Sequence, residues 1–192
     1  MRKDFYIFRH GETLLNAQAR IQGSGMDVEL NEVGKAQAMT LAQKLKPCDL
    51  EVIFSSPLKR AMQTARTVAE VCHCPVLVEN DLRECFYGIA EGLPVAEVKQ
   101  KYADVYANWA NPNFWDIAYP EGETKKAALE RVWKQIEELA ETPYKTMGVA
   151  IHGGTMGSLL NYLHYDFERI ENCAVFHLIY YDNKWRIEGG LF

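Results

Sequence analysis

The chain has 192 residues, of which 48% are hydrophobic and 24% charged, and its formal net charge is −5. This length and composition predict one globular domain, residues 1–192, large enough to bury its own core. The net negative charge argues against nucleic acid as a partner, because binding to a phosphate backbone requires clustered basic residues. No apolar run approaches the length that spans a membrane, so we expect no membrane partner either.

Cysteine usage favours a reducing compartment. The five cysteines form an odd set without the paired spacing of a disulfide framework, and nothing resembling a secretion signal precedes them. We therefore expect free thiols and a cytoplasmic location. The sequence around Cys72, His73 and Cys74 lacks the second pair of ligands that a structural zinc site needs, so no metal is expected there.

The spacing of apolar residues predicts strands and helices that alternate along the chain. In each predicted helix apolar residues recur every three or four positions, as Ala38, Leu41 and Leu45 do in the first. The predicted elements are, in chain order, a strand at 4–8, a helix at 30–45, a strand at 50–56, a helix at 57–72, a strand at 76–79, a helix at about 95–106, a helix that starts after "PEGET", a strand at 147–152, a helix at about 156–163 and a terminal hairpin.

Capping residues support two of these helices. Ser56 is a candidate N-cap with Pro57 in the first turn, and Thr124 is a candidate N-cap for the helix after "PEGET". Alternation of strands and helices is typical of a layered α/β protein. We predict a three-layer sandwich with a largely parallel central sheet and helices on both faces.

Polar residues follow several of the predicted strands. Arg9 and His10 close the first strand, and His152 closes the fourth. Arg60 lies one turn into the helix after the second strand, and Glu84 lies in the loop after the third. Because the carboxyl ends of parallel strands meet at one edge of a sheet, we expect these side chains to lie close together.

Two arginines, two histidines and a carboxylate suit phosphoryl transfer. Guanidinium groups match the geometry of phosphoryl oxygens and offset their charge. A neutral histidine can attack phosphorus and divide hydrolysis into two steps through a phosphohistidine, and Gly11 would allow the backbone approach that orients His10. A carboxylic acid such as Glu84 can protonate the leaving oxygen, which contributes roughly 10²–10⁴ in rate.

Six ordered motifs carry a family resemblance. They are "RHGET" with Asn16 shortly after it, "QGSGMDVELNEVGKAQA", "SSPLKRAMQTA", "LRECFYGIAEG", "PEGET" and "IHGG". Their order and spacing, from about residue 5 to 157, resemble the histidine phosphatase superfamily, which includes cofactor-dependent phosphoglycerate mutase. The resemblance implies a phosphoglycerate mutase-like fold.

The resemblance also implies residue roles. His10 corresponds to the phosphorylated nucleophile, and Glu84 to the proton donor that later activates water. The implied phosphate clamp consists of Arg9, Arg60 and His152. Implied substrate or phosphate contacts are Asn16, Gln22, Gly23, Tyr87 and Gly153. The sequence departs from the mutase pattern at Gln22, where mutases commonly carry threonine, and at Cys85-Phe86, where they often carry polar or basic residues.

Residues at about 89–122 are predicted to form a lid over the site. A mutase needs extra cations there, because it holds a second phosphate and a carboxylate. The chain has no arginine between Arg83 and Arg131, and within 89–122 two lysines stand against five acidic residues. The lid is instead rich in aromatic residues, namely Tyr102, Tyr106, Trp109, Phe114, Trp115 and Tyr119. This composition favours hydrolysis of a monoester with an apolar or ring-bearing leaving group.

Two other classes of function use the same residues. His10, His152 and Glu84 could ligate a metal for hydrolysis, although two arginines in the pocket would repel a dication. A module that only binds phosphorylated ligands would need the clamp, but it would need neither a nucleophile nor an acid.

The sequence thus predicts a metal-independent phosphomonoesterase of the histidine acid phosphatase type, acting without a cofactor on a small phosphorylated metabolite through a phosphohistidine on His10. The alternative is a cofactor-dependent phosphoglycerate mutase or a bisphosphoglycerate-linked phosphotransferase. The terminal hairpin and the aromatic surface could support a homodimer.

Overall fold

A mixed six-stranded sheet forms the centre of the protein. The computed structural model describes residues 1–191. The strands are β1 (Lys3–Arg9), β2 (Val52–Ser55), β3 (Val76–Val78), β4 (Thr146–Ile151), β5 (Val175–Tyr181) and β6 (Lys184–Glu188), in the order β3-β2-β4-β1-β5-β6. The first four are mutually parallel, whereas β5 runs antiparallel to β1 and pairs with β6 as a hairpin. The prediction of a largely parallel sheet with a terminal hairpin is confirmed.

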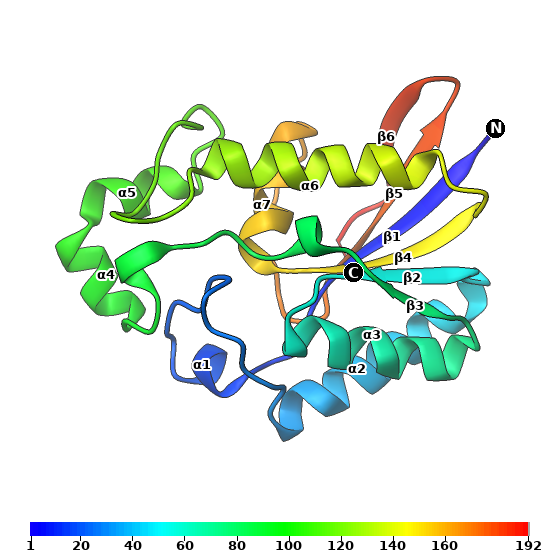
Figure 1. Ribbon diagram of the computed structural model, residues 1–192, viewed down its shortest axis with the longest axis horizontal. Helices are drawn as coiled ribbons and strands as arrows, with labels where there is room; N and C mark the ends of the chain where they lie inside the picture. The colour runs from blue at the N-terminus through cyan, green and yellow to red at the C-terminus, as the bar shows by residue number, and fades with distance from the viewer. Residues whose placement is uncertain (192) are drawn as a thin grey trace.

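Helices cover both faces of this sheet (Figure 1). One face carries α6 (Lys125–Ala140) and α7 (Gly153–Tyr162), and the other carries α2 (Glu32–Leu45) and α3 (Lys59–Cys72). Each face buries its own apolar cluster, and the two clusters alternate along β1 because successive side chains of a strand point to opposite faces. Phe5 and Ile7 contribute to the cluster that contains the apolar residues of α6 and α7, and Phe8 to the one under α2 and α3. The predicted three-layer α/β architecture is confirmed.

The capping predictions have different outcomes. Thr124 caps α6 by accepting a hydrogen bond from the backbone N–H of Ala127. Ser56 does not cap α3, which begins at Lys59 after an extended residue, Leu58. The prediction for Ser56 was wrong because the helix begins later: the Ser56 hydroxyl accepts from the N–H of Leu58, which is itself the N-cap, and contacts Nε2 of His152.

Two further boundaries differ from the predictions. The helix expected at 95–106 is two short helices, α4 (Val95–Lys101) and α5 (Ala103–Trp109), separated at Tyr102, whose φ of −128° and ψ of 44° are not helical. The break lets side chains of both helices join one apolar cluster with Tyr119. α7 begins at Gly153, three residues earlier than expected, directly at the end of β4.

The remaining elements are short. They are α1 (Leu14–Ala17) and the 3-10 turns η1 (Lys46–Cys48), η2 (Asn80–Leu82) and η3 (Gly88–Ala90). In Figure 1, α1, α4 and α5 lie beyond the carboxyl ends of the parallel strands, away from the stacked layers. No helix within residues 1–191 is both long and apolar enough to cross a membrane.

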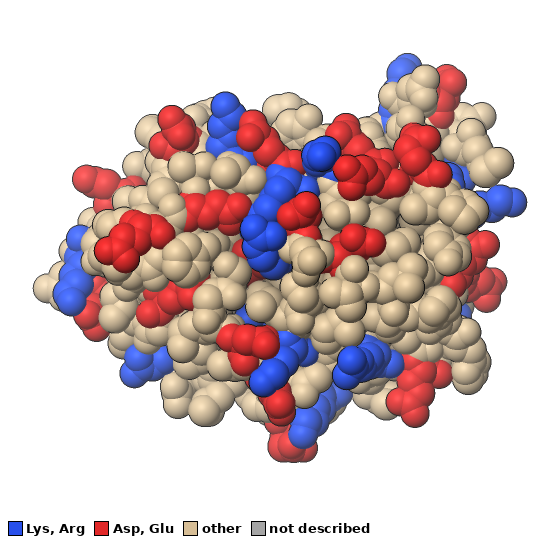
Figure 2. Space-filling model, in the orientation of Figure 1, with Lys and Arg blue, Asp and Glu red and all other residues tan. Residues whose placement is uncertain are grey.

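Charged side chains of both signs are interspersed on the face shown in Figure 2, and an uncharged area lies over β2 and β3. In β3, the edge strand, Leu77 and Val78 are exposed. No single sign of charge dominates this face, so it offers no extended electrostatic site for a polyanion.

Candidate active site

The candidate site lies at the carboxyl ends of three adjacent parallel strands. The backbone N–H of His10 donates to Ile151 of β4, and the N–H of Ser56 donates to Ala150 of the same strand. This register places the residues that follow β1, β2 and β4 at one level of the sheet. The helices that follow β1 and β4 lie on opposite faces, and such a switch point is where open α/β sheets bind ligands.

A cavity of about 430 Å³ opens at this edge. Its volume suits a small-molecule ligand. Every residue to which the family resemblance gave a role lines it, except His152, whose ring lies 5.2 Å from the His10 ring, centroid to centroid. The lining set is Arg9, His10, Asn16, Gln22, Gly23, Arg60, Glu84, Tyr87 and Gly153. The structure therefore brings together side chains that come from five separate segments of the chain.

The tautomer of His10 follows from its two neighbours. Its Nδ1 lies 2.7 Å from the carbonyl oxygen of Gly11, which can only accept, so Nδ1 carries the hydrogen. Its Nε2 accepts a hydrogen bond from Nε of Arg60 at 3.3 Å. Burial first, and then the positive charges of Arg60 and Arg9, lower the pKa of His10 well below its ordinary value. His10 is therefore neutral at physiological pH and presents the lone pair of Nε2 beside a guanidinium.

Arg60 is fully buried yet remains charged, because a guanidinium is not deprotonated in proteins. Its other two nitrogens donate to the carbonyl oxygens of Met26 and Gly23, at 2.8 and 2.7 Å. Gly23 has a φ of +64°, and a Cβ there would clash with Glu91, so only glycine fits this loop. The loop carbonyls thus hold the guanidinium in one orientation against Nε2 of His10.

Arg9, a half-buried residue, supplies a second cation. Its Nη1 donates to the carbonyl oxygen of Ile170 at 2.6 Å, whereas its Nε has no hydrogen-bond partner among the described residues. An unsatisfied buried donor costs on the order of 1–3 kcal/mol. An anion bound in the cavity would offset that cost.

His152 is oriented by Ser56. Its Nε2 lies 2.7 Å from Oγ of Ser56, which also accepts from the backbone N–H of Leu58. When the hydroxyl donates its one proton to Nε2, the ring hydrogen of His152 lies on Nδ1. Nδ1 has no partner within residues 1–191, and burial, followed by the Arg60 charge, lowers the pKa of His152 well below its ordinary value. A neutral ring with a free donor suits an anionic ligand.

Glu84 reaches from the loop after η2 to the first turn of α7. Its carboxylate oxygens accept hydrogen bonds from the backbone N–H groups of Gly154 at 2.8 Å and Thr155 at 2.9 Å. A helix N-terminus favours such a negative charge. Gly154 allows this approach, because a Cβ there would lie 1.9 Å from the Tyr87 hydroxyl and 2.9 Å from Oε1 of Glu84.

The mouth of the cavity is ordered by a small polar network. Thr13 caps α1 in a capping box with Asn16, and its hydroxyl also donates to Oε1 of Gln22 at 2.9 Å. Asn172 donates to the carbonyl oxygen of His10 at 3.1 Å and to Oδ1 of Asn16 at 3.3 Å. These bonds fix the Asn16 and Gln22 side chains relative to His10.

Three of the six aromatic residues of the 89–122 segment line the cavity: Tyr106, Trp109 and Tyr119. The Trp109 and Tyr119 rings stack with centroids 5.6 Å apart, and Tyr87 packs edge-on against Trp109 at 5.1 Å. Tyr102 packs within the adjoining apolar cluster, Trp115 packs against the main core and Phe114 is exposed. Tyr106, Trp109 and Tyr119 thus form an apolar wall of the cavity. This wall contains fewer aromatic residues than the composition of the segment suggests.

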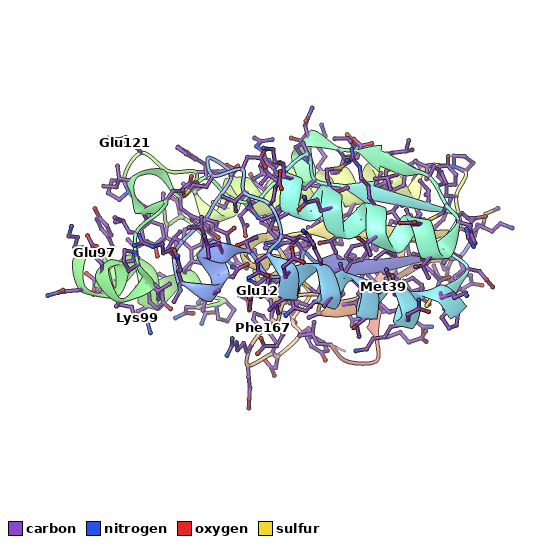
Figure 3. The ribbon with its side chains drawn as sticks, turned by 90° about the horizontal axis from the view of Figure 1, so that it is seen from below. Glu12, Met39, Glu97, Lys99, Glu121 and Phe167 are labelled. Atoms are coloured by element: carbon purple, nitrogen blue, oxygen red, sulfur yellow. The ribbon has the colours of Figure 1, made fainter. Side chains whose placement is uncertain are left out.

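The charges of the segment lie outside the cavity. Figure 3 shows Glu97, Lys99 and Glu121 at one end of the molecule, while Phe167, which lines the cavity, lies nearer its middle. Nζ of Lys99 lies 5.1 Å from the centroid of the Tyr106 ring, and Lys101 pairs with Glu97 at 2.7 Å. Neither lysine lines the cavity, so neither can contribute to binding an acidic substrate in this arrangement.

Two arginines from other parts of the chain reach the mouth. Arg20 lines the cavity and donates to the carbonyl oxygen of Gly92 at 2.6 Å. Arg169 also lines it and pairs with Glu171 at 2.9 Å. Both are exposed, and Glu168 lies at the same mouth. The sequence analysis counted cations only within the predicted lid and did not foresee this pair.

The comparison with protein families matches residues 5–190 to the histidine phosphatase superfamily (branch 1). The chain belongs to this superfamily. The resemblance drawn from the six motifs is confirmed, and the protein is an enzyme of the histidine phosphatase superfamily.

Relatives of this chain carry names of both phosphatases and mutases. An uncharacterized phosphatase, PhoE, from Bacillus subtilis is 30% identical over 95% of this chain and 91% of its own. A probable phosphoglycerate mutase, GpmB, from Yersinia pestis is 30% identical over 96% of this chain and 88% of its own.

Solved structures give the same picture. A mycobacterial glucosyl-3-phosphoglycerate phosphatase in complex with VO3 matches with a TM-score of 0.86 and 25% identity over 98% of both chains. A phosphoglycerate mutase from Bacillus anthracis matches with a TM-score of 0.88 and 25% identity over 98% of this chain and 92% of its own. The phosphoglycerate mutase-like fold is confirmed.

Several residues that shape the site were not predicted from the sequence. Ser56 follows a strand, a position that could have signalled a role, but it was interpreted as a helix cap. Asn172 lies in a loop without a motif. Thr64, whose hydroxyl accepts from the backbone N–H of Gly11 at 3.0 Å, has the spacing of an ordinary core residue of α3. No group of three or more potential metal ligands is assembled within residues 1–191.

Proposed function

We propose that the protein is a phosphomonoesterase of the histidine acid phosphatase type, which hydrolyses a small phosphorylated metabolite through a phosphohistidine on His10 without a metal or cofactor. One observation carries the proposal. Nε2 of a neutral His10 sits 3.3 Å from Nε of a buried arginine, inside a cavity that Arg9 and Glu84 also line.

The first step transfers the phosphoryl group to His10. The lone pair of Nε2 forms a bond to phosphorus while the bond from phosphorus to the leaving oxygen breaks. The guanidinium groups of Arg9 and Arg60 offset the charge on the phosphoryl oxygens, and Nδ1–H of His152 adds a neutral donor. Glu84 delivers a proton to the leaving oxygen, and a substrate that binds as the monoanion supplies that proton.

The second step returns the enzyme to its starting state. Glu84, now a carboxylate, takes a proton from water as the water oxygen bonds to phosphorus. The N–P bond breaks and its electron pair returns to Nε2 of His10. Glu84 passes this proton to the departing inorganic phosphate and is a carboxylate again. The hydrogen bond between Nδ1–H and the Gly11 carbonyl keeps the ring in the tautomer that the next cycle needs.

The apolar wall supports a ring-bearing or apolar leaving group. The floor of the cavity is formed by His10 and the residues around it, Arg9, Arg60 and Glu84. Beyond this floor the wall offers ring faces and edges, where the part of the substrate released in the first step would lie.

A cofactor-dependent phosphoglycerate mutase, or a bisphosphoglycerate-linked phosphotransferase, is the second candidate. It is favoured by the two arginines at the mouth, Arg20 and Arg169, which could hold a carboxylate or a second phosphate, and by relatives named as mutases. Both arginines are exposed, and Arg169 is already paired with Glu171. Among the described residues that line the cavity, the only cations besides Arg9 and Arg60 are exposed, so the hydrolase remains the better fit.

A phosphatase panel without added metal and with a chelator present tests the proposal. We expect release of inorganic phosphate from several monoesters, and loss of that release in His10→Ala. Isomerisation of 3-phosphoglycerate, measured in parallel with bisphosphoglycerate supplied, should be slower than hydrolysis. Isomerisation that outpaces every hydrolysis would establish the mutase, and release that depends on added metal would overturn the metal-independent mechanism.

A further inference from the structure

The loop that carries Glu84 is held by Arg131, a residue of α6 with no role in the steps above. Each of its five N–H donors is engaged. Nη1 donates to the carbonyl oxygens of Asp81 and Arg83, at 2.7 and 2.8 Å, and Nη2 donates to that of Glu84 at 3.0 Å. The remaining two bonds, from Nη2 and Nε, go to the carboxylate of Glu123, at 2.8 and 2.9 Å.

Glu123 holds the same loop from its other side. One of its carboxylate oxygens accepts from the backbone N–H of Phe86 at 3.3 Å, and its own N–H donates to the Phe86 carbonyl at 2.7 Å. Burial would raise the pKa of Glu123, but the hydrogen bonds from Arg131 hold it below its ordinary value. The side chains of Arg131 and Glu123 are only 13% and 18% exposed, so this ion pair is far less screened than one at the surface.

The consequence for Glu84 is geometric. Its side chain must cross from this loop to the N-terminus of α7, where Gly154 and Thr155 bind it. The backbone on both sides of Glu84 is fixed by the Arg131–Glu123 pair, whereas the side chain of Arg83 points to Asn80 and Asp81 and is 40% exposed. Arg131 ties the backbone of the loop to α6 through three hydrogen bonds.

We infer that Arg131, paired with Glu123, is a positioning residue for the general acid, holding the Glu84 carboxyl at the distance from which it protonates the leaving oxygen. The inference rests on the proposed function, since it assumes that Glu84 is that acid. Arg131 itself touches no substrate: it does not line the cavity. Its loss should therefore affect proton donation and leave the phosphate floor in place.

Leaving groups of different basicity separate this role from a merely structural one. An alkyl phosphate needs protonation of its leaving oxygen, whereas p-nitrophenyl phosphate releases a stable anion. For Arg131→Met we expect kcat/KM, which reports the first step, to fall by about 10²-fold on an alkyl phosphate, within the usual contribution of acid catalysis, and much less on p-nitrophenyl phosphate. Glu123→Gln should show the same selectivity to a smaller extent, and Arg131→Lys should recover part of the lost rate.

Arg83→Met is the matched control, because it removes an arginine side chain from the same loop and leaves the Arg131–Glu123 ion pair intact. It should leave both rates near those of the unmodified enzyme. If Arg131→Met does not fold, as judged by near-ultraviolet circular dichroism, Glu123→Gln and Arg131→Lys carry the test. Equal losses on both substrates, or no loss on either, would overturn the inference.

Glu84→Gln distinguishes failure of the inference from failure of the proposed function. If Glu84→Gln is selective for the alkyl phosphate and the Arg131 variants are not, the positioning role alone is contradicted. If Glu84→Gln shows no selectivity, Glu84 is not the general acid, and the positioning role is contradicted with it.

Discussion

The floor and the apolar wall of the cavity are built on different principles. On the floor, His10, Arg60 and Glu84 are held by directional hydrogen bonds to backbone groups at the ends of strands and at a helix start. On the wall, Trp109 and Tyr119 are held by ring packing in a segment that lies off the sheet. Directional bonds fix a single geometry, whereas apolar packing tolerates substitution by residues of similar size. We therefore expect the chemistry to depend steeply on the floor and the choice of substrate to depend gradually on the wall.

Removal of the nucleophile should have the largest effect. For His10→Ala we expect kcat/KM to fall by on the order of 10⁴-fold or more, as is usual when a covalent nucleophile is lost. His73→Asn is a matched control, because His73 has a φ of +57° and asparagine tolerates that conformation. Phosphate release at substrate concentrations well below KM measures kcat/KM for both variants. A His10→Ala variant that keeps a tenth of the activity would contradict the covalent mechanism.

Removal of the floor's central cation should change both rate and pH dependence. Arg60→Met is expected to lower kcat by about 10²–10³-fold, the usual loss for one preorganised electrostatic group. Activity of the unmodified enzyme should fall with acid only as pH drops through the depressed pKa of His10, well below 6.5. Because Arg60 is one cause of that depression, the acid limb should move upward toward 6.5 in Arg60→Met. NMR titration of the His10 ring measures the shift directly, and an unmoved or lowered pKa would contradict the assigned contact.

Crowding the acid should have an intermediate effect. In Gly154→Ala the new Cβ would meet the Tyr87 hydroxyl and Glu84, so we expect kcat on an alkyl phosphate to fall by about 10²-fold as acid catalysis is lost. Gly157→Ala, in the same helix, is the comparison, since its nearest neighbour would be a Phe167 ring atom at 3.4 Å. Similar losses in the two variants would show that α7 tolerates no side chain at either position, and that the acid is not specifically displaced.

Changing the wall should have the smallest effect. For Trp109→Leu we expect KM for an aromatic phosphate to rise by about tenfold, corresponding to the roughly 0.5–1.5 kcal/mol of an aromatic pair, with kcat little changed. Phe114→Leu changes an exposed aromatic residue of the same segment that does not line the cavity, and it should alter neither parameter. A large fall in kcat for Trp109→Leu would show that the wall takes part in the chemistry.

The floor was more predictable from sequence than the wall, for a physical reason. Arg9, His10 and His152 directly follow apolar strands, and parallel strands bring their carboxyl ends to one edge, so local patterns were enough to group them. Glu84 and Arg60 follow strands in the same way. The succession of strands and helices along the chain, the helices on both faces and the Thr124 cap followed from equally local signals.

Contacts between distant segments were not predictable. Arg131 is 47 residues from Glu84, and its five hydrogen bonds depend on how α6 packs over the loop. Arg20 and Arg169 reach the cavity from outside the segment in which cations were counted. The break at Tyr102 arises because side chains on both sides of it join one cluster with Tyr119, a tertiary requirement that overrides the helical pattern.

Rapid-quench mass spectrometry of the enzyme during turnover tests the central claim most directly. Samples quenched in alkali, which preserves phosphohistidine, should contain a phosphoryl group on Nε2 of His10 that forms within one turnover and decays at a rate compatible with kcat. The adduct should be absent from His10→Ala. Steady turnover with no phosphorylated histidine at any quench time, or with the phosphoryl group on another residue, would contradict the account.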